Sequence, residues 1–98
     1  MAKFLYAYSG GTTAANEEER SARMQKWQTW LNGLGPALVD MGAPFAQSQS
    51  VHGKGGGKLT GYSIVEAGSL DEAVRLTKGL PILEDADGSV EVYEAISM

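Results

Sequence analysis

The sequence predicts an α+β fold of the ferredoxin-like type, in which one face of a four-stranded antiparallel sheet carries two helices. Apolar residues alternate with a period of two in four short segments and recur at helical spacing in two others. The order of these segments is β-α-β-β-α-β, as expected for two βαβ halves that share one sheet. The chain has 98 residues, so we expect a single domain over residues 1–98.

The first expected strand is KFLYAY, residues 3–8. Phe4, Tyr6 and Tyr8 fall on one face, and Leu5 and Ala7 fall on the other. Neither face is polar, which is typical of a central strand.

Three further strands are expected along the chain, at residues 37–42, 59–68 and 89–96. The first of them continues irregularly through 43–52, where Pro44 implies a bend or a sheet edge.

The first helix is expected to begin after Asn16, a good N-cap, because three glutamates follow it in the first turn. Glycines 33 and 35, with the proline at 36, are expected to end it. Its apolar stripe consists of Met24, Trp27, Trp30, Leu31 and Leu34.

The second helix is expected over roughly residues 70–79. Ser69 and Glu72 have the spacing of a capping box, which marks its start. Gly79, followed by Leu80 and Pro81, marks its end.

Two helices cover only one face of a four-stranded sheet. The other face still carries apolar and aromatic residues, and an exposed patch of that kind usually marks an interface. We therefore expect a homodimer in which two sheets pack face to face.

Composition excludes several function classes. The formal net charge is −4, and the eight lysines and arginines are spread along the chain, so neither nucleic acid nor an anionic membrane is an expected partner. There is no cysteine, which removes disulfides, thiolate metal sites and cysteine nucleophiles and suits a reducing cytoplasm. No apolar run approaches the length of a membrane span, and the N-terminus lacks the pattern of a signal peptide.

Four stretches together resemble the YCII-related family, which includes the DGPF-type proteins. They are KFLYAY, LVDMGAPF, LTGYSIVEAGSLDEAVRLTKGLPIL and GSVEVYEAI, and they cover nearly the whole chain. The counterpart of the DGPF motif is Gly42-Ala43-Pro44-Phe45. These motifs indicate a fold, and none of them is a catalytic signature.

The resemblance implies a dimeric α+β barrel formed by two ferredoxin-like subunits. It also implies a small bacterial protein, in a family where most members have no established activity. Some members carry a histidine on the first helix and an aspartate just before the proline that follows the second helix. Here Met24 and Leu80 stand at those places, which argues against that chemistry in this chain.

The segment VHGKGGGKLTGYS, residues 51–63, raises the question of a phosphate-binding loop. A Walker A motif fails, because Leu59 follows Gly57-Lys58 where a hydroxyl is needed, and His52 stands at the first glycine position. Two interpretations stay open. The segment is a flexible connection between two strands, or it is a mobile lid whose Lys54 or Lys58 meets an anionic ligand. The order of residues 53–58 is left open too.

The candidate catalytic residues are His52 and Asp40. His52 is the chain's single histidine, so it is either a general base beside a pocket or a solvated residue at a strand end. Asp40 lies in the apolar segment ALVDMG and either points inward, where its pKa would rise, or faces solvent. One histidine without cysteine gives no recognised ligand spacing, so we expect neither a metal nor another cofactor.

A pocket in this fold would lie between the helices and the sheet. A mostly aromatic lining with one or two polar groups suits a small organic ligand. We expect a homodimeric binding or accessory protein of unspecified function. The alternative is a cofactor-independent enzyme of the monooxygenase, isomerase or lyase type that acts on a small organic compound. The pocket candidates are Tyr6, Tyr8, Trp27, Asp40, His52 and Tyr62.

Overall fold

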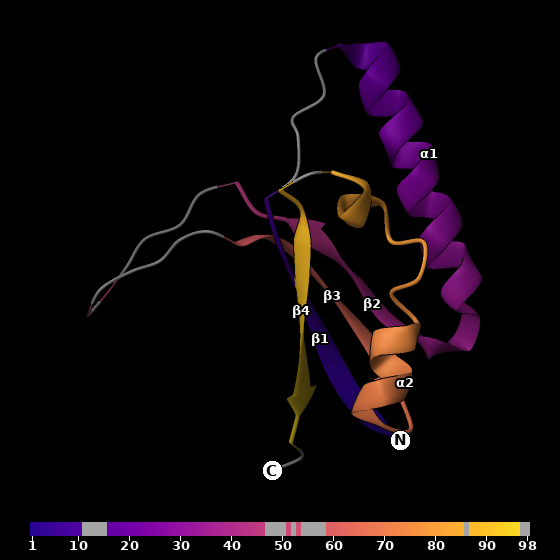
Figure 1. The fold of residues 1–98 in the computed structure, drawn as a ribbon, viewed down its shortest axis with the longest axis vertical. Helices are drawn as coiled ribbons and strands as arrows, with labels where there is room; N and C mark the ends of the chain where they lie inside the picture. Colours follow the sequence, from indigo (N-terminus) through magenta and orange to yellow (C-terminus); the bar gives the residue numbers. More distant parts are fainter. Residues whose placement is uncertain (11–15, 47–50, 52, 54–58, 86, 97–98) are drawn as a thin grey trace.

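The computed structural model describes residues 1–10, 16–46, 51, 53, 59–85 and 87–96 (Figure 1). The strands pair in the order β2-β3-β1-β4, and every pair is antiparallel. This arrangement confirms the predicted ferredoxin-like α+β fold. The elements, in chain order, are β1 (Ala2–Ser9), α1 (Glu17–Leu34), the 3-10 turn η1 (Gly35–Ala37), β2 (Leu38–Pro44), β3 (Leu59–Ala67), α2 (Leu70–Arg75), the 3-10 turn η2 (Pro81–Glu84) and β4 (Ser89–Ala95).

Strand β1 is central, because it pairs with both β3 and β4. Its residues Phe4, Tyr6 and Tyr8 point to one side and are at most 4 % exposed. The Tyr6 and Tyr8 rings contact tryptophans of α1, and the Tyr6 hydroxyl donates a hydrogen bond to a backbone carbonyl of α2. Both helices therefore cover the same face of the sheet (Figure 1).

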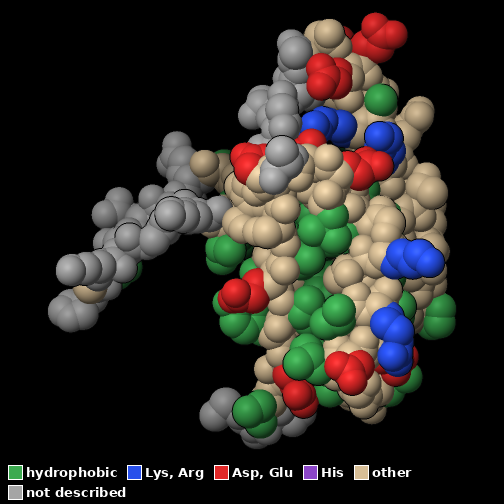
Figure 2. Space-filling model, viewed as in Figure 1, with side chains coloured by type: hydrophobic (Ala, Val, Ile, Leu, Met, Phe, Trp, Pro, Cys, Tyr) green, Lys and Arg blue, Asp and Glu red, His purple; other side chains and the backbone are tan. Residues whose placement is uncertain are grey.

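The core lies between this face and the helices. Trp30, Leu31 and Leu34 come from α1, and Val65 and Ala67 come from β3. Figure 2 shows hydrophobic side chains gathered along β4 and toward α2, whereas acidic side chains gather at the N-terminal end of α1. The side chains on the helix-covered face of the sheet and those of α1 thus form one core.

Helix α1 begins as its capping signal predicts. The Asn16 side chain accepts a hydrogen bond from the Glu19 N–H at 2.8 Å. The helix ends at Gly35, whose φ of +55° suits a residue without a Cβ. Gly33 lies inside the helix rather than at its end.

Helix α2 also begins as predicted but ends early. The Ser69 hydroxyl accepts from the Glu72 N–H at 3.2 Å, and the Glu72 carboxylate accepts from the Gly68 N–H at 3.0 Å. The expected range of 70–79 was too long, since the Thr77 N–H bonds the Val74 carbonyl three residues back. At a helix end, hydrogen bonds to the third preceding residue, as in a 3-10 helix, commonly replace the α-helical bonds to the fourth. Val74, near the end of α2, is 49 % exposed.

No helix in the described part of the chain is long and apolar enough to cross a membrane.

Candidate ligand-binding cavity

An open cavity of about 540 Å³ lies between α1 and the β2–β3 half of the sheet. Its volume lies within the range of small-molecule sites, about 300–1,000 Å³. The wall is mostly apolar. It consists of Tyr8, Arg20, Met24, Trp27, Gln28, Leu31, Met41, Gly42, Ala43, Pro44, Thr60, Gly61, Tyr62, Ser63 and Ile82.

Helix α1 supplies one side of the cavity through residues three or four positions apart. Arg20, Met24, Trp27 and Leu31 follow each other on a single helical face. Leu31 is 8 % exposed, whereas Met24 is 66 % exposed. The face therefore packs into the core at its C-terminal part and borders the open cavity at its N-terminal part.

The opposite side of the cavity is built from small residues. Gly42 and Ala43 of β2 lie beside Gly61 and Ser63 of β3. A Cβ on Gly61 would lie 3.1 Å from the Ala43 carbonyl oxygen, so the two strands approach closely there. Short side chains on this side leave the space that α1 does not fill.

Strand β2 is irregular where it borders the cavity. Its register to β3 shifts on both sides of Asp40, and the Asp40 carboxylate accepts a hydrogen bond from the Gly42 N–H at 2.8 Å. Gly42 has a φ of +75°, and a Cβ there would lie 1.7 Å from the Tyr62 carbonyl oxygen. Only glycine fits this position without displacing the backbone. Asp40 is exposed and outside the cavity wall, so the solvent-facing alternative is the one observed.

Tyr8 brings a buried polar group to the cavity. Its side chain is 4 % exposed, and among the described residues its hydroxyl has no hydrogen-bond partner. The nearby Ser63 hydroxyl donates instead to the Met41 carbonyl at 2.8 Å. Burial raises the pKa of Tyr8 to about 12, and the proximity of the Ser63 hydroxyl opposes that rise. The Tyr8 hydroxyl, protonated at neutral pH like any tyrosine, is thus a buried donor that lacks a partner among the described residues.

The Tyr8 ring is also fixed in place. It meets the Trp27 ring edge-on, with centroids 5.2 Å apart and planes at 66°. Trp27 in turn meets Trp30 edge-on at 6.0 Å. These ring contacts connect Tyr8 in the cavity wall, through Trp27, to Trp30 in the core.

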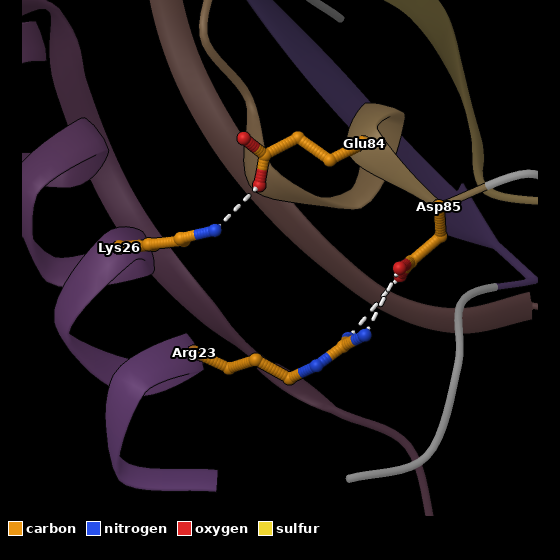
Figure 3. A network of polar contacts seen from close by, with 4 residues as sticks. All are labelled: Arg23, Lys26, Glu84 and Asp85. Carbon is orange, nitrogen blue, oxygen red and sulfur yellow. Dashed lines mark hydrogen bonds and ion pairs between the residues drawn. The ribbon is translucent and has the colours of Figure 1, made fainter. Parts of the chain in front are cut away.

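Arg20 is the charged residue of the cavity wall. The next two cations on α1 are neutralised by carboxylates in or just after η2 (Figure 3). Arg23 bonds Asp85 through both terminal guanidinium nitrogens, at 2.9 and 3.2 Å, and Lys26 bonds Glu84 at 3.2 Å. No ion pair joins Arg20 to another residue within the described ranges.

The structure brings the side chains of two predicted pocket residues, Tyr8 and Trp27, together in the cavity wall. Tyr62 also borders the cavity, but alternation along β3 places its side chain on the other face of the sheet, where it stacks on Phe45. Tyr6 does not border the cavity, because its hydroxyl is held by the Ala73 carbonyl in the core. Asp40 lies outside the wall as well.

His52 lies outside the described residues, as do both lysines of the glycine-rich segment. Among the residues whose positions are given, no group of three potential metal ligands occurs.

Sequence analysis named neither Arg20 nor Met24 as a pocket residue, although both belong to the cavity wall. Both lie one or two turns before Trp27 on the same helical face. Extending that face toward the N-terminus of α1 was the signal that could have found them.

Comparison with known proteins supports the fold. No protein-family model matches the chain, and no curated protein matches it. Among solved structures, it is similar to 5-chloro-2-hydroxyhydroquinone dehydrochlorinase (TftG) from Burkholderia phenoliruptrix AC1100, in complex with 2,5-dihydroxybenzoquinone. The identity is 21 %, the TM-score is 0.53, and the match covers 93 % of this chain and 91 % of the other. At this level of identity the likeness supports the ferredoxin-like α+β fold and does not single out the YCII-related family.

Proposed function

We propose that this protein binds a small, ring-sized organic compound in the cavity between α1 and the β2–β3 half of the sheet. The observation that carries the proposal is a mostly apolar cavity of about 540 Å³ with a few polar groups in its wall. Small-molecule sites generally combine an apolar enclosure with a small number of orienting polar groups. The proposal keeps the expectation of a bacterial, cytoplasmic, single-domain protein of the YCII-related type.

Binding is tested by calorimetric titration with a panel of hydroxylated and carboxylated benzenes. Filling the cavity through Met24→Trp should abolish binding, because Met24 borders the open space. The matched control is Gln25→Trp, which adds the same group at an exposed helix position outside the wall. Thermal unfolding of both variants checks the fold. Equal loss in both variants, or no binding by any member of the panel, would contradict the proposal.

A second candidate function is a cofactor-independent enzyme that acts on a small organic compound. The observation that favours it is the Tyr8 hydroxyl, a buried donor that belongs to a cavity-wall residue and has no partner among the described residues. The structurally similar protein is named as a dehydrochlorinase of a hydroxyhydroquinone, and its structure holds 2,5-dihydroxybenzoquinone. These facts make substituted hydroquinones the first compounds to test.

Turnover would be followed by chromatography of the products. Catalysis by Tyr8 predicts that Tyr8→Phe loses turnover yet still binds the compound. Asp40→Ala and His52→Ala test the two residues singled out from the sequence. Absence of turnover across the panel would leave binding as the function.

The homodimer remains part of the proposal, with the sheet face opposite the helices as its interface. Alternation along β1 and β3 places Leu5, Tyr62 and Ile64 on this face. The Phe45 ring, 46 % exposed, stacks on Tyr62 with centroids 5.8 Å apart. An apolar and aromatic surface of this kind is best covered by a second copy, whose matching face has the same character.

Light scattering at micromolar concentration tests the assembly. We expect a dimer for the native chain and a monomer for Ile64→Lys, since a buried unpaired ammonium opposes the interface. Gln25→Lys places the same charge on exposed α1 and should remain dimeric. A monomeric native chain would refute this interface.

A further inference from the structure

Resting on the proposed ligand cavity, we infer that its ligand is a hydroxylated aromatic carboxylate, with the carboxylate held by Arg20 and the ring hydroxyl bonded to Tyr8. The two polar groups lie at different depths. Arg20 is exposed, whereas the Tyr8 side chain is 4 % exposed. The cavity therefore offers a cation at its open side and a neutral hydroxyl at its buried side.

The charge of the wall selects an anion. Arg20 is its one charged residue, since the wall within the described ranges contains no aspartate, glutamate or lysine. The three glutamates that precede Arg20 in the first turn of α1 are exposed and are not part of the wall. A guanidinium fits a carboxylate with two parallel N–H···O hydrogen bonds, which a neutral amide cannot reproduce.

Among the described residues, the two neighbouring cations on α1 are already paired with carboxylates of the chain, whereas Arg20 is not. Arg23 and Lys26 lie one and nearly two turns further along α1, and each bonds a carboxylate of the chain itself (Figure 3). Arg20 has no such bond to any residue that the structure describes. Of these three cations, Arg20 is thus the one that both borders the cavity and keeps its charge available.

The middle of the cavity selects an aromatic ring. Met24, Trp27 and Leu31 on the helix side face Met41 across the space, and Ile82 completes the apolar wall. A small inorganic anion would leave these side chains uncovered, whereas a planar ring buries their apolar surface. Thioether and indole groups both make favourable contacts with aromatic rings.

The buried side selects a hydroxyl. A buried polar atom without a partner is rare in folded proteins, and a ligand is one way to supply the partner. The Tyr8 hydroxyl lacks a partner within the described part of the chain, and as a tyrosine hydroxyl it carries its proton at neutral pH. It can donate to a ligand hydroxyl oxygen at the end of the ring opposite the carboxylate.

The test uses calorimetry with three probes: 4-hydroxybenzoate, its neutral isostere 4-hydroxybenzamide, and benzoate. The native protein should bind 4-hydroxybenzoate about tenfold to hundredfold more tightly than the amide, because a charge-assisted bidentate contact is lost. Arg20→Gln should remove that preference. Lys26→Gln removes the same charge from α1 outside the cavity wall and should keep it.

The hydroxyl contact is tested in the same titrations. The native protein should prefer 4-hydroxybenzoate to benzoate by about threefold to tenfold, as expected for one neutral hydrogen bond. Tyr8→Phe should abolish this second preference and leave the first intact. Circular dichroism and thermal unfolding confirm that each variant folds.

The outcomes separate this inference from the proposed function. Equal affinity for the acid and the amide, or an acid preference that survives Arg20→Gln, overturns the aromatic-carboxylate inference while ring binding stands. A hydroxyl preference that survives Tyr8→Phe overturns the role of Tyr8. Failure of both acid and amide to bind overturns the inference and the proposed function together.

Discussion

Two tyrosines on one face of β1 provide a sharp test of the cavity's structure. Tyr6 and Tyr8 are both almost fully buried, and the change to phenylalanine removes the same single oxygen from each. Their hydroxyls differ in one respect. The Tyr6 hydroxyl donates to the Ala73 carbonyl, whereas the Tyr8 hydroxyl has no partner among the described residues.

The structure gives the expected size of each effect. Ala73 lies near the C-terminal end of α2, and the backbone N–H four residues later bonds the Val74 carbonyl instead. Tyr6→Phe therefore leaves a buried carbonyl unpaired, which should lower the free energy of unfolding by about 1–3 kcal/mol. Tyr8→Phe removes a buried group that has no partner to lose, so its effect should lie within about 0.5 kcal/mol of zero or be stabilising.

The assay is urea unfolding of the ligand-free protein, followed by circular dichroism. All samples need the same protein concentration, since a dimer unfolds in a concentration-dependent way. The slope of the transition should stay unchanged, because neither variant alters the area exposed on unfolding. For a chain of this size, 1 kcal/mol corresponds to a change of about 4–8 °C in Tm. A loss in Tyr8→Phe as large as that in Tyr6→Phe would refute the assignment of an unpartnered hydroxyl to the cavity.

The remaining predictions concern alkaline pH and strand β2. Burial raises the pKa of Tyr6 and Tyr8 from 10.0 to about 12, so between these values the folded state binds more protons than the unfolded state. The free energy of unfolding should then fall as pH rises from about 10 to about 12, and a flat profile in urea titrations would contradict it. Gly42→Ala should cost about 2 kcal/mol or more, since its positive φ and the close Tyr62 carbonyl exclude a Cβ. Gly33→Ala, inside α1 with open space around the new Cβ, should instead stabilise by about 0.5–1 kcal/mol; thermal unfolding compares the two, and similar losses would refute the distinction. Asp40→Ala should cost at most about 1 kcal/mol and leave aromatic binding unchanged, because this carboxylate holds the bulge outside the cavity; calorimetry would show a lost affinity if Asp40 belongs to the site.

The local elements of the fold were predictable because their signals lie within a few residues of each other. The alternation in KFLYAY places three aromatic rings on one face of β1. Asn16 and Ser69 mark the two helix starts, because each side chain accepts from a backbone N–H three residues later. The order of these elements then leaves the ferredoxin-like fold as the expected result.

One local expectation failed, and one alternative left open by the sequence was decided only by the structure. Helix α2 stops after Arg75 because bonds to the third preceding carbonyl replace the helical pattern. The orientation of Asp40 could not be derived by alternation, since two register shifts flank it in β2. A bulge changes which face a residue takes, and nothing in the apolar pattern of ALVDMG fixes its position.

By itself, the sequence determined the strands, the helix starts and the sheet face that the helices cover, since period and capping act over one or two turns of chain. Only the tertiary structure decided where the cavity lies and that Arg20 and Tyr8 border it. The space exists because large residues on α1 stand opposite glycine, alanine and serine on β2 and β3. The cavity depends on how the side-chain volumes of α1, β2 and β3 fit together. These elements are far apart in the chain, so no local periodic pattern in the sequence reports that fit.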